Sequence, residues 1–219
     1  MLRDRIEQVE ERIRRAAERA GRGRQDITLV AVTKKFPAEV IRSAYEQGLR
    51  HFGENYVQEF DGKQPALADL RDAEFHLIGH LQSNKARAAA GLFHTIQTVD
   101  SERLARRLDE AGNPLEVMIE VKLSPEDSKS GVLPADLAAL TSAIRSCSNL
   151  RLTGLMTMPP WNDDPEQTRP YFRRLADLGR QHALPRLSMG MSHDFEAAIE
   201  EGATHIRVGR ALFGPRPGP

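Results

Sequence analysis

LVAVTKKFP, residues 29–37, is the stretch on which the interpretation of the whole chain depends. A short apolar run that stops at a proline is typical of a buried strand. A strand buried on both faces is a costly place for an ammonium group unless the lysine lies where the strand emerges. We therefore predict Lys34 at the carboxyl end of the strand, with Lys35 pointing the other way by strand alternation. A desolvated lysine amine has a lowered pKa and is the usual nucleophile toward an aldehyde.

The rest of the chain alternates between strand-like and helix-like patterns. An amphipathic helix is predicted over residues 2–20. Helical patterns then separate eight apolar runs, which we predict as strands at 27–33, 50–53, 74–78, 93–99, 115–122, 151–156, 186–189 and 204–208.

Eight strands that alternate with helices predict one α/β domain over residues 1–219, a (β/α)8 TIM barrel with an extra N-terminal helix. Residues 1–24 would be that helix and a linker, and residues 215–219 a tail. An open doubly wound sheet is the competing fold, but eight strands are many for it. No GxGxxG follows the first strand, as a dinucleotide-binding fold would require.

Composition narrows the function classes. The chain of 219 residues carries 31 basic and 31 acidic side chains, so no net field would attract nucleic acid or an anionic membrane. Its single cysteine, Cys147, excludes an intramolecular disulfide and fits a reducing compartment. No apolar run approaches the length of about 20 residues that a membrane span needs, and the charged N-terminus lacks the apolar core of a signal peptide. We expect a cytoplasmic protein, and a monomer because the first helix shows no coiled-coil seam.

The ends of the last two strands suggest a phosphate site, because barrels often bind phosphate there. Met191 and Ser192 lie at the start of a helix predicted over residues 192–200, where free N–H groups favour an anion. Gly209 lets the backbone approach a ligand, and Arg207 adds a positive charge. The alternative is that Ser192 is only a helix cap and Gly209 only a turn. The lysine at the end of the first strand favours the phosphate site.

Other polar residues fall at the predicted mouth without a clear assignment. Glu54 and Asn55 either start the next helix or, together with Tyr56, face a ligand. His80 is ambiguous, and the seven histidines show no metal-ligand spacing such as HExxH, so no metal site is expected. A phosphate site and an amine across one barrel mouth suit a phosphorylated aldehyde, and pyridoxal 5′-phosphate (PLP) is the common cofactor of that kind.

Six motifs occur in an order that resembles the pyridoxal-phosphate homeostasis proteins, the YggS/PROSC family. They are AVTKKFP, FGENYVQE, FHLIGHLQSNK, GLMTMPP, LSMGMSHD and IRVGRALFG. The resemblance implies the fold of the alanine racemase N-terminal barrel and PLP as a covalent aldimine on Lys34. Our leading hypothesis is that such a protein holds PLP and releases it to amines or to PLP-dependent apo-enzymes.

The same resemblance assigns further contacts to the cofactor. It implies Ser192 and the backbone N–H groups of Gly209 and Arg210 at the phosphate, Arg207 beside the pyridine nitrogen, and Asn55 and Met156 near the ring. The sequence departs from the family pattern at Arg210, where a small hydroxyl residue is usual, and at His80, where a proline is common.

Two arguments favour a PLP carrier in vitamin B6 homeostasis over a racemase. Racemisation needs acid–base groups on both faces of the substrate. The racemases with this barrel take the second base from an added β-domain, and only 11 residues follow Val208. An arginine at the ring nitrogen would keep that nitrogen unprotonated and the ring a poor electron sink. The alternatives are a small racemase with Tyr56 or His80 as the second base, and a cofactor-free Schiff-base aldolase.

Overall fold

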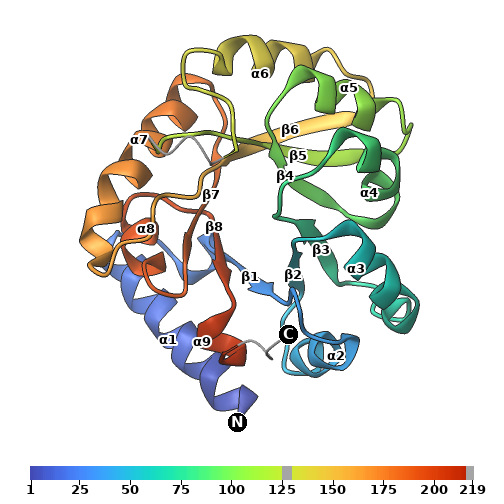
Figure 1. The fold of residues 1–219 in the computed structure, drawn as a ribbon. Coiled ribbons are helices and arrows are strands. Elements are labelled where there is room, and N and C mark those ends of the chain that lie inside the picture. The colour runs from blue at the N-terminus through green and yellow to red at the C-terminus, as the bar shows by residue number, and fades with distance from the viewer. Residues whose placement is uncertain (125–129, 216–219) are drawn as a thin grey trace.

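Eight parallel strands close into a barrel in the order β1 to β8, as the sequence predicts (Figure 1). The computed structural model describes residues 1–124 and 130–215, so the last four residues of the predicted tail lie outside it. The strands are β1 (Thr28–Val32), β2 (His51–Glu54), β3 (Glu74–Leu77), β4 (Thr95–Val99), β5 (Leu115–Glu120), β6 (Leu150–Met156), β7 (Arg186–Met191) and β8 (His205–Val208).

Helices surround this barrel and connect consecutive strands (Figure 1). The α-helices are α1 (Leu2–Arg19), α2 (Ala38–Glu46), α3 (Val57–Lys63), α4 (Ala86–Leu92), α5 (Glu102–Asp109), α6 (Leu137–Arg145), α7 (Arg169–Gln181), α8 (Phe195–Glu200) and α9 (Arg210–Phe213). Short 3₁₀ turns lie at η1 (Arg24–Asp26), η2 (Gln64–Leu67), η3 (Ser83–Lys85) and η4 (Pro165–Thr168). Helical periodicity did not predict the short helices α3 and α9, because each is too brief to show it. The one sequence indication of α3 was the alternative that Glu54 and Asn55 start a helix, and α3 begins just beyond them at Val57.

The closing contact of the barrel is made by β1. Val30 pairs with His51 of β2 on one side and with Arg207 of β8 on the other. The apolar run of β1 is buried on both faces, because one face lines the barrel and the other packs under the helices. This arrangement brings the turn after β1 next to the loop after β8.

The predicted N-terminal helix is α1, which packs across α8 and α9 on the outside of the barrel (Figure 1). Its buried face repeats at helical spacing with Ile6, Val9 and Ile13. Arg22, just beyond the helix, donates to the carbonyl oxygens of Ile199 and Ala203 at 3.0 and 2.7 Å. The helix thus covers the helices that follow β7 and β8. No helix in the described ranges combines the length and the apolar character needed to cross a membrane.

Candidate functional site

The turn that carries Lys34 follows β1 rather than belonging to it. The strand ends at Val32, and Lys34 and Lys35 form a turn in which Lys34 is half-buried and Lys35 is exposed. The prediction that strand alternation separates the two lysines was therefore wrong. Their directions are set by the turn, where Lys35 has a φ of 65° and its N–H donates to Glu59 Oε1 at 2.6 Å. A left-handed φ is uncommon for a residue other than glycine, so this turn needs support from its surroundings.

A buried ion-pair network supplies part of that support. Lys63, only 9% exposed, donates from Nζ to the Thr33 carbonyl at 3.2 Å, to Glu54 Oε1 at 2.8 Å and to Glu59 Oε1 at 2.6 Å. The Thr33 hydroxyl also donates to Glu54 Oε1, at 2.8 Å. Burial raises the pKa of Glu54, and the hydrogen bond from Lys63 opposes that rise. Glu54 thus joins this network through Oε1. The network holds the residues on both sides of Lys34.

Ser192 lies in the loop between β7 and α8, not at the start of a helix. β7 extends to Met191, and α8 begins at Phe195 after Asp194, so the predicted helix start at residue 192 was wrong. The physical reason is local: Asp194 Oδ1 accepts the Met191 N–H at 2.7 Å and holds this loop as a turn.

Ser192 instead joins the loops after β7 and β8. Its Oγ accepts the N–H of Gly209 at 3.3 Å and the N–H of Ala211 at 3.2 Å. Two backbone N–H groups and one hydroxyl therefore lie together at the mouth, and in this structure the two N–H groups are paired with the Ser192 hydroxyl. Backbone N–H groups and hydroxyls are the groups that commonly bind an anion. Ser192 and Gly209, which the sequence predicts at one phosphate site, are in direct contact in this geometry. It also places the Ala211 N–H, which the sequence did not indicate, with them.

Gly209 brings the Ser192 hydroxyl and the two N–H groups that it accepts close to β1. A Cβ at this position would lie 3.3 Å from both the Cβ and the carbonyl oxygen of Val32, so a side chain would crowd the end of β1. Val32 is two residues before Lys34, so the Gly209 backbone and the lysine turn share one side of the mouth. Arg210 is exposed and begins α9. Its backbone, rather than its side chain, is thus the part fixed beside the donors.

Arg207 of β8 is buried inside the barrel at 3% exposure. It donates from Nη1 to Ser188 Oγ at 2.7 Å and from Nη2 to the Thr157 carbonyl at 2.9 Å. Burial lowers the pKa of Arg207 to about 10, so the guanidinium remains protonated at neutral pH. Arg207 therefore provides a fixed cation in the interior, with Asp194 and Glu120 as nearby negative charges.

A chain of polar side chains continues from Arg207 across the barrel. Ser188 Oγ donates to Gln97 Oε1 at 2.6 Å, and the other end of the Gln97 amide lies 3.2 Å from His76 Nδ1. β7 and β4 are not neighbours in the sheet, so the Ser188–Gln97 bond spans the interior. Polar groups in a barrel core are tolerated because each is hydrogen-bonded.

A cavity of about 560 Å³ opens at the carboxyl ends of β5 to β7. Of the predicted contact residues only Met191 lines it, and Met158, Trp161 and Glu120 are among the other lining residues. Glu120 is 3% exposed and its Oε2 has no hydrogen-bond partner in the described residues. Burial, reinforced by the charge of Asp100 and opposed by that of Arg207, raises the pKa of Glu120 to about 7.

Glu120 was not predicted as a mouth residue, although the sequence carries one signal for it. A single carboxylate interrupts the apolar run VMIEV at the end of β5, as lysine does at the end of β1. The roles of Lys63 and Glu59 had no such signal, because both lie on a short helix with an ordinary charged pattern.

The remaining predicted residues are spread around the mouth. Asn55 follows β2 and is half-buried, and its backbone is pressed against Gly79, whose Cβ would lie 2.3 Å from the Asn55 carbonyl oxygen. Met156 ends β6 and is fully buried. The two residues considered as a second base are both exposed: Tyr56 is 51% exposed, and His80 lies 3.7 Å from the Asp100 carboxylate.

The fold and this mouth define an alanine racemase-like barrel. The family model described as alanine racemase, N-terminal domain, matches residues 5–217. Two curated relatives are both named pyridoxal phosphate homeostasis protein. The one from Aquifex aeolicus is 46% identical over 223 residues, covering 97% of each chain. The one from Pseudomonas aeruginosa is 48% identical over 217 residues, covering 96% of this chain and 94% of the relative.

A solved structure is similar over the same extent. PipY of Synechococcus elongatus, determined with PLP bound, superposes with a TM-score of 0.85 at 39% identity and covers 98% of this chain and 100% of its own. The chain belongs to the family of the pyridoxal phosphate homeostasis proteins. The resemblance and the fold predicted from the sequence are thereby confirmed, whereas the individual contact residues stay predictions.

Proposed function

We propose that this chain binds PLP at the barrel mouth, holds it reversibly as a Schiff base on Lys34, and serves in PLP homeostasis. The observation that carries the proposal is the convergence of the Ser192 hydroxyl with the Gly209 and Ala211 N–H groups beside the end of β1. The names of the relatives and the PLP in PipY support the same cofactor.

The residues at the mouth fit such a group. The Ser192 loop and the Gly209 backbone would hold the phosphate, since backbone N–H groups and a hydroxyl are its usual ligands. Arg207 would face the ring nitrogen from inside the barrel, with Asn55 and Met156 at the sides of the ring and Met191 beside the phosphate. Arg210 would contribute its N–H. When bound, PLP supplies an aldehyde that reacts reversibly with amines.

The site is better suited to storing PLP than to racemising amino acids. An arginine cannot transfer a proton to the ring nitrogen, so the ring stays a weak electron sink. The fixed cation at Arg207 therefore favours holding the cofactor over stabilising a carbanion. The exposed Tyr56 and His80 have no water-excluded surroundings that would make either an efficient base.

Three further properties complete the proposal. The chain would pass PLP to PLP-dependent apo-enzymes, it would act in the cytoplasm, and it would be a monomer. A reversible Schiff base supports the first, because an incoming amine can exchange with the Lys34 amine. The lone Cys147 is consistent with the second. Size-exclusion chromatography with light scattering tests the third.

The decisive experiment is an absorption spectrum of purified protein with added PLP, before and after borohydride. A visible Schiff-base band that borohydride removes is expected for the wild type, with a pyridoxyl group on the peptide containing Lys34. Lys34→Ala should lack the band, and Lys35→Ala, the adjacent exposed lysine, should keep it. An equal band in Lys34→Ala would contradict the proposal. A sugar-derived adduct in protein that had received no PLP would indicate an aldolase. Rapid deuterium exchange at the α-carbon of alanine, lost in Lys34→Ala, would favour a racemase.

A further inference from the structure

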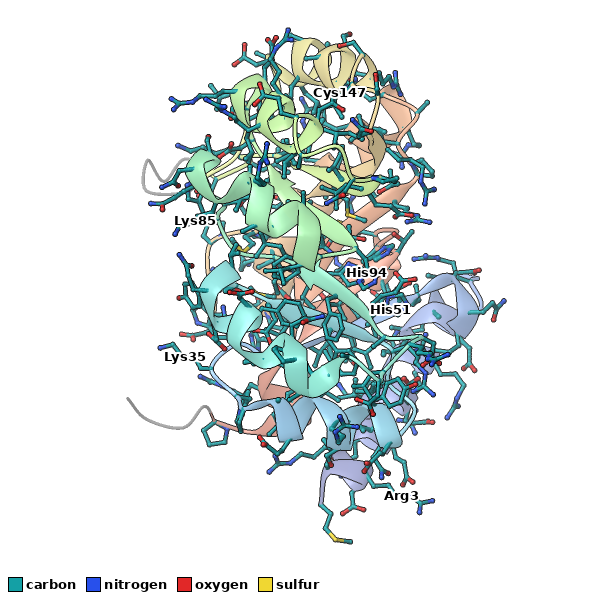
Figure 2. All side chains as sticks on the ribbon, turned by 90° about the vertical axis from the view of Figure 1, so that its right-hand side faces the viewer. Arg3, Lys35, His51, Lys85, His94 and Cys147 are labelled. Atoms are coloured by element: carbon teal, nitrogen blue, oxygen red, sulfur yellow. The ribbon has the colours of Figure 1, made fainter. Side chains whose placement is uncertain are left out.

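A second cluster of ligand-type side chains lies at the opposite end of the barrel from the mouth. His51 is the first residue of β2, Glu74 the first of β3, and His76 follows two residues later on β3. His51 and Glu74 are direct partners in the parallel pairing of these strands. Figure 2 shows His51 on the side of the molecule away from Lys35, which marks the mouth. The amino ends of barrel strands are usually structural rather than catalytic.

Each of the three side chains contributes one possible metal-ligand atom to the cluster. His51 Nδ1 lies 3.1 Å from His76 Nε2 and 3.6 Å from Glu74 Oε2, and the three atoms all lie within 4.8 Å of one another. Zinc binds imidazole nitrogen and carboxylate oxygen at about 2.0–2.2 Å in tetrahedral geometry, which sets neighbouring ligand atoms about 3.3–3.5 Å apart. The two shorter separations fall on either side of that value without any movement of the backbone.

Charges near the cluster also matter, because a nearby cation would repel a metal ion. The neighbouring cation Arg186 donates to Glu116 Oε2 at 2.5 Å, so its charge is locally compensated.

The cluster is accessible to solvent, and His76 has a hydrogen-bond partner that can orient its ring. His51 and Glu74 have side chains that are 33% and 52% exposed, whereas His76 is buried. An ion can thus enter from solvent and meet one fixed ligand. A metal on Nε2 of His76 leaves a proton on Nδ1, which faces the Gln97 amide at 3.2 Å. A half-turn of that amide presents its oxygen to Nδ1, and its nitrogen can then donate to Ser188 Oγ. Such partners orient metal-binding histidines.

We infer that His51, Glu74 and His76 form a binding site for a divalent transition metal, zinc foremost, with a fourth position open to water. The donor set of two imidazoles and one carboxylate is one that zinc uses. At this end of the barrel the ion would tie β2 to β3 rather than take part in chemistry at the mouth. The inference does not depend on the proposed function, because none of the three residues lies at the mouth.

The test uses the chain of residues 1–219 without an affinity tag, freed of metal by a chelator. Zinc chloride is titrated by calorimetry and by thermal unfolding into the wild type, His51→Gln, Glu74→Gln and the control His94→Gln. His94 is a nearby histidine outside the cluster, on the same side of the molecule as His51 (Figure 2). Cobalt(II) replaces zinc in a parallel titration, because its visible spectrum reports tetrahedral nitrogen and oxygen ligands.

We expect the wild type and His94→Gln to bind zinc and to unfold at a higher temperature with it. Removing a ligand should weaken binding by at least about tenfold, since the loss of even an outer-shell partner costs that much. Glu74→Gln changes an exposed side chain, so its fold should be intact, which metal-free unfolding curves would verify. Wild-type binding no tighter than that of the two ligand variants would overturn the inference. So would an equal loss in His94→Gln.

Discussion

Lys63 and Glu54 form a buried ion pair beside the lysine turn, with Nζ 2.8 Å from Oε1. The same ammonium donates to the carbonyl of Thr33, the residue that precedes Lys34. Because Glu59 accepts from both Lys63 and the Lys35 N–H, one network holds both sides of Lys34. The geometry of the proposed PLP lysine thus rests on charges that come from β2 and α3.

Replacing Lys63 with methionine should destabilise the protein by roughly 3–5 kcal/mol, because it leaves the Glu54 carboxylate buried without its cation. Urea unfolding measures the loss. The double variant Glu54→Gln/Lys63→Met removes both charges and should lose less than the sum of the two single variants. Strict additivity would show that the pair is not energetically coupled.

Replacing Ser192 with alanine should weaken PLP binding by roughly ten- to a hundredfold, the usual effect of losing a hydrogen bond to a charged group. Fluorescence titration measures the affinity. Pyridoxal, which has no phosphate, should bind the variant and the wild type equally. Ser142→Ala, an exposed serine on α6, is the matched control. If pyridoxal binding fell as much as PLP binding, Ser192 would not be a phosphate ligand.

Glu120 should make the protein less stable as the pH rises. Its native pKa of about 7 lies above the ordinary value of 4.5, so between these values the native state binds more protons than the unfolded state. Stability from this group is complete below about pH 4.5 and falls until the pH exceeds about 7, by at most about 3 kcal/mol.

Glu120→Gln should remove this part of the pH dependence. Unfolding free energies of the variant and the wild type at about pH 5 and about pH 8 measure it, since the difference between the two proteins should change by up to about 3 kcal/mol. Glu39→Gln, an exposed carboxylate on α2, should leave the profile unaltered. A profile that Glu120→Gln does not change would place the Glu120 pKa near its ordinary value.

Replacing Gly79 with alanine should cost about 1–3 kcal/mol, because the new Cβ would lie 2.3 Å from the Asn55 carbonyl oxygen and force the backbones apart. PLP binding should weaken with it, since Asn55 moves. Gly62→Ala in α3 meets nothing within 4 Å and should instead stabilise by about 0.5–1 kcal/mol. Thermal unfolding of both variants provides the comparison, and similar melting temperatures would show that the Asn55 backbone adjusts freely.

Local patterns were sufficient for the strands and for most of the helices. The apolar run before Lys34 and seven similar runs gave the strand count of the barrel, because burial on both faces leaves a continuous apolar signal. They were not sufficient at the loop after β7, where the Asp194 side chain holds a turn and delays α8. A side-chain bond to a nearby N–H competes with helix formation and leaves no trace in hydrophobic periodicity.

By itself, the sequence determined the barrel, the lysine after its first strand, and the family to which the chain belongs. Only the tertiary structure decided which groups meet. The Ser192–Gly209 contact joins residues 17 apart, the Ser188–Gln97 bond joins residues 91 apart, and the cluster of His51 and His76 comes from two strands. The physical reason is that burial and strand formation depend on neighbours along the chain. Distances, charge pairs and pKa shifts depend on barrel closure, which brings together residues that share no local pattern.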